Sequence, residues 1–224
     1  MAGYFLGGSL APLGLSVSFL RCPVDRVRDA LMTWRTDELG QNIERTGPAW
    51  FPDCVSLLDP LEAPWTTELV IGCGDWTAYL NNGIDGGDPT AAAPYLSTRL
   101  GCDCVIAMHA PAHAPGHAAT QLWVLGPGGE PPLMYVRTIA ARAEDGLWSW
   151  TTSGAVQSFE TPERYEARQI KDRFDRPLLV EYLAGLGIRV DDLTTYDDGF
   201  GLRQVVDFER RRETAAQVRA RFGW

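Results

Sequence analysis

A run of short strands in the middle of the chain constrains the fold more than any other feature. Strands are predicted over residues 104–108, 120–125, 133–142 and 147–153. The Asp145-Gly146 pair between the last two strands is a typical hairpin turn. Strands joined by such short connections pair with their sequence neighbours in an antiparallel meander. The sequence therefore predicts an antiparallel sheet.

More strands and a helix are predicted before the meander. Apolar residues alternate over 14–22 as in a strand, and Pro23 then suits the first turn of a helix with apolar residues at helical spacing. Two further strands, at 67–72 and 75–80, end at an Asn-Gly turn. The stretch 40–66 holds four prolines and few periodic apolar residues, so we expect a long irregular connection there.

A capping residue followed by proline predicts the start of three more helices. These helices begin at Asp88-Pro89, Thr161-Pro162 and Asp175-Arg176-Pro177. They are expected to end at Leu100, Arg173 and Gly187. The charge-dense residues 203–224 have sparse apolar positions at roughly helical spacing, which predicts a C-terminal helix.

Strands grouped in hairpins, with helices before and after them, are typical of the α+β class. We expect an antiparallel meander sheet with helices packed on one face, in two layers. The chain of 224 residues is long enough to bury a sizeable core and shows no internal repeat or low-complexity linker. Residues 1–202 are therefore expected to form a single domain, followed by the C-terminal helix.

The charge of the chain limits the classes of partner. The formal net charge is −9, whereas proteins that bind nucleic acids usually carry a basic patch or stripe. We therefore expect no nucleic-acid partner. An acidic surface suits a basic protein partner, and it also serves solubility alone.

The five cysteines and the apolar segments indicate a compartment. The cysteine count is odd and the spacing scattered, which favours reduced thiols over a disulfide framework. Residues 2–20 carry no charge but lack the basic start of a signal peptide and are broken by Pro12. No run of 18 apolar residues occurs, so no membrane span is expected. A cytoplasmic protein is the expectation.

Histidines and cysteines near residue 110 form a candidate zinc site. All three histidines of the chain lie there, at His109, His113 and His117, shortly after Cys102 and Cys104. Imidazoles and thiolates are the usual zinc ligands. The alternative is a surface loop of Ala, Pro and His between two strands, because Pro111, Pro115 and Gly116 break any helix that would align the histidines. No other cofactor is indicated.

No catalytic arrangement is recognisable in the sequence. A nucleophilic serine or cysteine needs a base, and no Gly-x-Ser-x-Gly or comparable motif supplies the frame. We therefore assign no catalytic residue and favour a non-enzymatic role.

Aromatic and acidic residues are candidates for a partner-binding surface. Trp148 and Trp150 share one face of their strand, and neighbouring strands could bring Trp123 and Tyr135 alongside. Burial in the core is the alternative for this group. After the third helix come two aspartate pairs, Asp191-Asp192 and Asp197-Asp198. Such pairs form either a solvated acidic patch or a docking surface for a basic partner.

Several short motifs resemble a group of bacterial proteins of unassigned function from GC-rich genomes. They are Gly74–Tyr79 (GDWTAY), the 148–160 segment ending in Phe159-Glu160, Arg164-Tyr165, 172–174 (DRF) and 182–188 (YLAGLGI). The resemblance spans about half the chain through motifs of structural type. In size and charge alone, the chain is also similar to immunity proteins that neutralise toxin domains.

Two functions follow as hypotheses. The first is a non-enzymatic protein-binding module of immunity or accessory type, which docks a partner through an acidic surface bearing aromatic residues. The second is a small-molecule enzyme or ligand-binding protein. Its pocket would lie between the sheet and the helices, with an arginine such as Arg137 holding an anionic group. The oligomeric state is not indicated.

Overall fold

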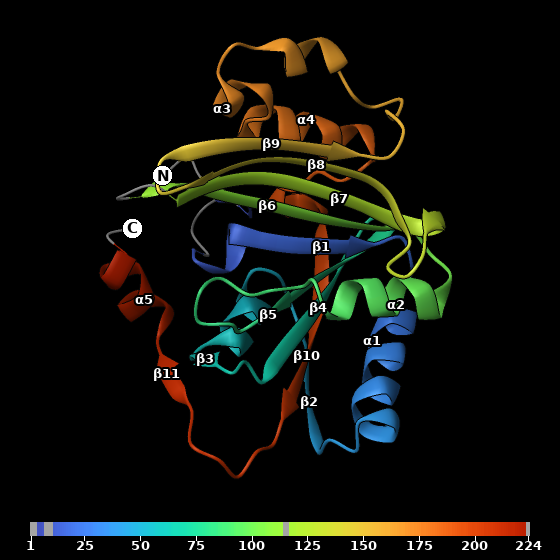
Figure 1. Ribbon diagram of the computed structural model, residues 1–224. Coiled ribbons are helices and arrows are strands. Elements are labelled where there is room, and N and C mark those ends of the chain that lie inside the picture. The colour runs from blue at the N-terminus through green and yellow to red at the C-terminus, as the bar shows by residue number, and fades with distance from the viewer. Residues whose placement is uncertain (1–3, 7–10, 114–116, 223–224) are drawn as a thin grey trace.

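The computed structural model describes residues 4–6, 11–113 and 117–222, with a large antiparallel sheet at its centre (Figure 1). Nine strands form this sheet in the order β2-β10-β4-β5-β1-β6-β7-β8-β9. The predicted α+β class and antiparallel sheet are confirmed. The strands are β1 Ser16–Leu20, β2 Ile43–Ala49, β4 Thr67–Cys73, β5 Trp76–Asn81, β6 Cys104–His113, β7 His117–Glu130, β8 Tyr135–Glu144, β9 Leu147–Ser153 and β10 Tyr196–Gln204.

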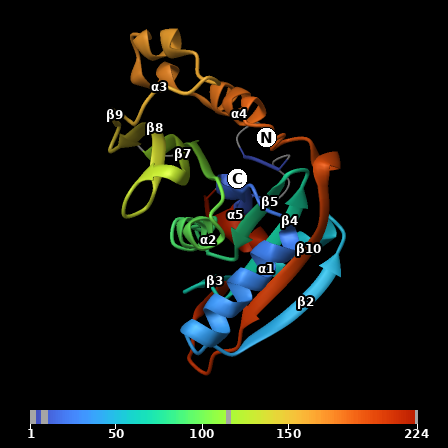
Figure 2. The same cartoon turned by 90° about the vertical axis from the view of Figure 1, so that its right-hand side faces the viewer.

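The predicted meander is β6 to β9, and β1 connects it to the rest of the sheet. In β1, Ser18 lies between Tyr79 of β5 and Ile106 of β6. All five residues of β1 are buried because neighbours cover the strand on both sides. The sheet twists strongly, so β6 to β9 run in a different direction from β4, β10 and β2 (Figures 1 and 2).

Helices cover both faces of the sheet, which corrects the prediction that they share one face. Helices α1 (Val24–Thr33) and α2 (Ala92–Leu100) pack on one face in a cluster with Val70 and Tyr79. Helices α4 (Arg176–Gly185) and α5 (Ala215–Phe222) belong to a cluster with Leu69 and Ile71. Consecutive residues of a strand point to opposite faces, so the two clusters form separate layers.

A buried ion pair fastens the end of α1 to the sheet. The π-helical turn η2 (Trp34–Glu38) continues α1 and brings Arg35 to Glu68 of β4, with N–O distances of 2.9 and 2.7 Å. The Tyr79 hydroxyl donates to the same carboxylate at 2.6 Å. Burial, with the charge of Glu68, raises the pKa of Tyr79 well above its usual value, so the tyrosine remains a donor.

The stretch 40–66 is more regular than predicted. It contains β2, the 3₁₀ helix η3 (Asp53–Leu58) and β3 (Leu61–Ala63). β2 gives no alternating pattern because it is an edge strand with mostly exposed residues. Strand β10 was not predicted either, because Gly199 and Gly201 interrupt its apolar pattern. At Gly199 a side chain would collide with Cys54 of η3, its Cβ lying 2.7 Å from the sulfur.

Three predicted helices are shorter than expected. The helix expected from Asp88-Pro89 is α2, which begins at Ala92 without a side-chain cap. Residues 161–173 form only the 3₁₀ helix η4 (Pro162–Glu166) and the short α3 (Ile170–Arg173). In the tail, β10 extends through Gln204, β11 (Arg211–Glu213) follows, and α5 alone is helical. No helix in the described part of the chain is long and apolar enough to span a membrane.

The tail is held to the domain by the buried carboxylate of Glu62. Strand β11 pairs with β3, and Arg212 and Arg210 approach Glu62 at 2.9 and 2.8 Å. Thr66 also donates a hydrogen bond to this carboxylate. Burial alone would raise the pKa of Glu62, but the hydrogen bond from Thr66 and the charge of Arg210 hold it below its ordinary value of 4.5.

Acid is therefore expected to weaken this attachment. A carboxyl with a lowered pKa in the folded state contributes stability above pH 4.5, and this contribution is lost as the pH falls through the lowered value. Denaturant unfolding of the wild type and of Glu62→Gln across acidic pH measures the effect. The stability difference between them should shrink as the pH falls below 4.5. A difference that stays constant would contradict the assignment.

Candidate functional site

Five aspartates gather around the start of β10, at one end of the sheet. Burial raises the pKa of the Cys54 thiol to about 11, and the charges of Asp198 and Asp53 raise it further. Burial likewise raises the pKa of Tyr196, with contributions from nearby carboxylates. These effects place the carboxylates close to β10 and η3. The group comprises Asp53, Asp191, Asp192, Asp197 and Asp198.

An exposed tryptophan stands beside these carboxylates. Ala49, the last residue of β2, pairs with Gly199 of β10, so Trp50 follows next to Asp198. The Trp50 residue is 73% exposed, the second highest value among the large exposed apolar residues of the described chain. A bulky ring that contacts so little of its own chain is available to another molecule. We call Trp50, Asp53 and Asp198 the Trp50 surface.

The backbone under the Trp50 surface is held firmly. The amide of Cys54 donates to the carbonyl of Trp50 at 2.9 Å, which closes the turn into η3. The ring of Phe51 stacks on the ring of Tyr196, with 4.8 Å between centroids. The Tyr196 hydroxyl donates to the carbonyl of Val190 at 3.1 Å. Neighbouring residues therefore anchor the strand end, and Trp50 projects from a fixed base.

A shallow cavity continues from the Trp50 surface along η3. It has a volume of about 340 Å³ and lies between η3 and α5. Asp53 and Asp59 contribute carboxylates to its wall, Arg219 contributes a guanidinium, and Val55 contributes apolar atoms. A side chain that reaches past Trp50 would meet a wall that carries both signs of charge beside apolar atoms.

The predicted aspartates divide into two kinds. Asp191 pairs with Arg176 at 2.6 Å, and Asp192 accepts a hydrogen bond from the Thr194 amide at 3.2 Å. These two carboxylates have structural partners within the chain. Asp197 is exposed and Asp198 half-buried, both on β10. Asp197 is therefore the one of the four predicted aspartates that is exposed, whereas Oδ1 of Asp198 is buried without a hydrogen-bond partner.

The predicted tryptophans lie elsewhere. Trp148 and Trp150 do share a face of β9, where they pair with Ala143 and Ala141 of β8. They are half-buried, and the Trp150 ring packs against Tyr165 at 5.2 Å between centroids. Strand β9 is the edge of the sheet opposite to β2. The β9 tryptophans and the aspartates therefore do not form the single surface that the sequence predicted. The exposed aromatic residue beside the aspartates is Trp50.

Trp123 and Tyr135 do not lie alongside Trp148 and Trp150. Both pack in the cluster under α1 and α2, on the face opposite to the two β9 tryptophans. The expected single row of four aromatic residues is therefore split between the two faces of the sheet.

The predicted zinc ligands do not form one group among the described side chains, although His113 and His117 pair across β6 and β7. Cys104 is buried in the cluster under α1 and α2. His109 lies five positions further along β6, and thus on the other face, with Nδ1 3.0 Å from the Thr120 hydroxyl. Burial, with the charge of Arg176, lowers the pKa of His109 to about 4.

The other predicted ligands do not complete a metal site with these two. Cys102 is half-buried near the start of β6, and His117 is exposed at the start of β7. The side chain of His113 is outside the described part of the structure. Among the described residues, no group of three or more His, Cys, Asp or Glu side chains could hold a metal ion.

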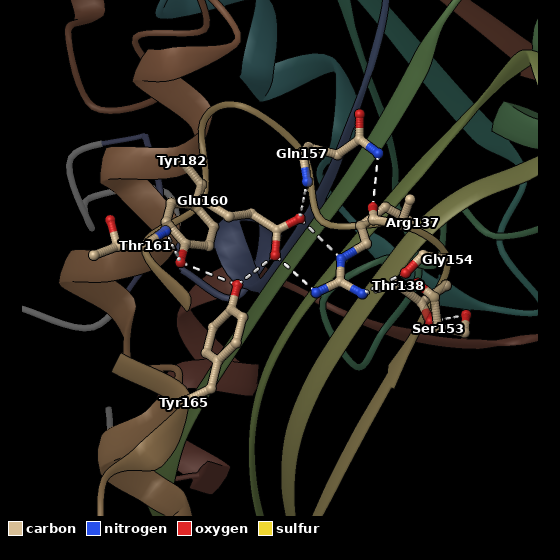
Figure 3. A network of polar contacts seen from close by, with 10 residues as sticks. Arg137, Thr138, Ser153, Gly154, Gln157, Glu160, Thr161, Tyr165 and Tyr182 are labelled. Atoms are coloured by element: carbon tan, nitrogen blue, oxygen red, sulfur yellow. Dashed lines mark hydrogen bonds and ion pairs between the residues drawn. The ribbon is translucent and has the colours of Figure 1, made fainter. Parts of the chain in front are cut away.

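Arg137, expected to hold an anionic ligand, is engaged within the chain instead (Figure 3). Its guanidinium donates to both carboxylate oxygens of Glu160 at 2.8 and 2.7 Å. The side chains of Arg137 and Glu160 are 4% and 0% exposed. Tyr165 donates to Glu160 at 2.6 Å, and Tyr182 donates to Tyr165 at 3.0 Å. An external anion has no access to this arginine.

This network, the Glu160 network, explains several motifs that carry the resemblance. Glu160, Tyr165 and Tyr182 come from three separate motifs and meet at one buried point (Figure 3). Arg137 further donates to the carbonyls of Ser153 and Gly154 at 3.2 and 2.8 Å. The network thus ties η4 and α4 to β8 and β9. Glu160, Tyr165 and Tyr182 therefore have a structural role.

Comparisons with known proteins name no family. No family profile, curated protein or solved structure matches this chain. The candidate site therefore depends on geometry alone.

Sequence reasoning missed Trp50 and Asp53, although a signal was present. Trp50 stands between Pro48 and Pro52, in the stretch 40–66 that has few periodic apolar residues. A large aromatic residue in a segment without apolar periodicity is not assigned to a core face by the pattern, although Phe51 beside it packs on Tyr196. Such a residue is a candidate for exposure.

Proposed function

We propose that this chain is a non-enzymatic protein-binding module that docks a basic partner through the Trp50 surface. The observation that carries the proposal is the 73% exposed Trp50 on a fixed base beside Asp53 and Asp198. A partner in the style of a toxin domain neutralised by an immunity protein fits this chemistry.

Two physical effects support binding at this surface: burial of the tryptophan ring and electrostatic attraction by the carboxylates. Tryptophan is enriched among the residues that dominate binding energy, because its large rigid ring buries much area at little entropic cost. Carboxylates around the anchor attract a basic surface over long range and speed association. The chain carries a net charge of −9, so this attraction adds to the general field of the molecule.

Replacing Trp50 by alanine should abolish most of the affinity while leaving the fold intact. Loss of a central aromatic anchor costs about 2 kcal/mol or more, or roughly 30-fold in the dissociation constant. The partner is first captured on immobilised wild-type protein, identified by mass spectrometry and purified. Calorimetric titration of the purified partner then compares the wild type with Trp50→Ala.

The matched control removes an exposed apolar side chain elsewhere. Leu133 is 43% exposed in the β7–β8 connection, so Leu133→Ala should bind as the wild type does. Asp53→Asn with Asp198→Asn should slow association and reduce its dependence on salt. The proposal fails if no captured protein distinguishes the wild type from Trp50→Ala. Equal affinity for the wild type and Trp50→Ala would also refute it.

A further inference from the structure

The two edge strands of the large sheet, β2 and β9, differ in whether they carry residues that prevent pairing with another chain. β2 carries the features that keep an edge strand from pairing with another chain, namely charged Glu44 and Arg45 and the interruption at Gly47-Pro48. β9 carries none of them. It pairs with β8 in unbroken register from Leu147 to Ser153 and has no charged residue or proline.

Absence of charge extends along the whole β9 edge. From Leu147 to Val156 the sequence is LWSWTTSGAV, without an ionisable side chain, in a protein of net charge −9. Leu147 is 78% and Val156 is 55% exposed, at the two ends of this segment. Solvent-exposed edges without charge or proline are templates for another strand.

We propose that β9 pairs with β9 of a second copy of this chain, which gives a two-fold symmetric dimer with one continuous sheet. An antiparallel arrangement centred on Trp150 places Trp148 opposite Thr152 and Ser149 opposite Thr151 of the other copy. Side chains directly opposite each other share a face, so Trp150 meets Trp150 between two Trp148–Thr152 pairs on one face, and Ser149–Thr151 pairs lie on the other. No like charges are opposed, as a symmetric interface requires.

The position of β9 in the sheet favours a second copy over an acidic or basic partner. The five aspartates lie at the β10 end, and β9 is the opposite edge (Figure 2). Pairing at β9 therefore keeps the two acidic ends apart, which limits the repulsion between two chains of net charge −9. The inference is independent of the Trp50 surface, which remains open in the dimer.

The mass in solution tests the proposal. Light scattering after size exclusion should give twice the chain mass of 24.7 kDa for the wild type. Ser149→Lys with Thr151→Lys places like charges opposite each other at two exposed positions, so this variant should be a monomer. Thr46→Lys, on the exposed face of β2, is the matched control and should remain a dimer.

A charge-swap experiment separates pairing from misfolding. Ser149→Glu with Thr151→Glu should also be a monomer alone. Mixed with the lysine variant, it should form a heterodimer, because lysine then lies opposite glutamate. A wild type of single-chain mass, a dimer that survives the lysine substitutions, or two monomeric variants that do not combine would overturn the proposal.

Discussion

Replacing Arg137 with leucine should lower the free energy of unfolding by about 3–5 kcal/mol. The substitution leaves Glu160, 0% exposed, without its bidentate partner. A carboxylate that is buried without a cation carries a large free-energy penalty, which destabilises the folded state. Urea denaturation at neutral pH measures the loss. The loosened segment should be η4 to α4, because Arg137 and Glu160 join it to β8 and β9.

Replacing Glu160 as well separates the effect of the unpaired charge from the effect of lost packing. When both partners become leucine, no unpaired charge is left in the interior, so the double variant should lose less stability than the two single variants together. A loss in Arg137→Leu below about 1 kcal/mol, the value of an exposed pair, would contradict the buried role of this residue.

Replacing Arg35 with methionine should also cost about 3–5 kcal/mol. Arg35 and Glu68 are 9% and 3% exposed, and after the change Glu68 retains only the hydroxyl of Tyr79. The loss should be accompanied by faster amide exchange in η2, because Arg35 ties this turn to β4. Denaturant unfolding and hydrogen exchange provide the two measurements.

The chain offers a matched control for this second prediction. Arg28, on the preceding helix α1, lies over the Phe200 ring at 4.9 Å from its centroid and pairs with Asp25 and Asp29, whose side chains are 70% and 60% exposed. Solvent screens such pairs, so Arg28→Met should change stability by less than about 1 kcal/mol. Similar losses for Arg28→Met and Arg35→Met would show that burial does not set the strength of these ion pairs.

Local patterns predicted most of the elements. Pro23 marked the start of α1, the Asp145-Gly146 turn marked the β8–β9 hairpin, and Asp175 caps α4 through the Leu178 amide at 2.9 Å. These features depend on neighbours in the sequence. Strands β2 and β10 depend on each other and on β4 instead, so no local pattern announced them.

One feature of the sequence does indicate that helices cover both faces of the sheet, namely a strand without an alternating pattern. β4 is buried at all seven positions, with Leu69, Val70 and Ile71 in succession. A strand covered on one face alternates, whereas one covered on both faces is continuously apolar. Contacts between residues far apart in the sequence also limited the prediction of the site residues. Arg137 was identified as a residue of interest, but its partner Glu160 lies 23 positions away and only the fold joins them.

The strand order has a consequence for synthesis on the ribosome. β2 joins the sheet only through β10, whose residues 196–204 are made about 150 positions later. Until β10 leaves the exit tunnel, β4 has an open edge and β2 has no neighbour in the sheet. A nascent chain that ends before Tyr196 therefore lacks β10, and both β2 and the edge of β4 are exposed to chaperones until β10 has been made.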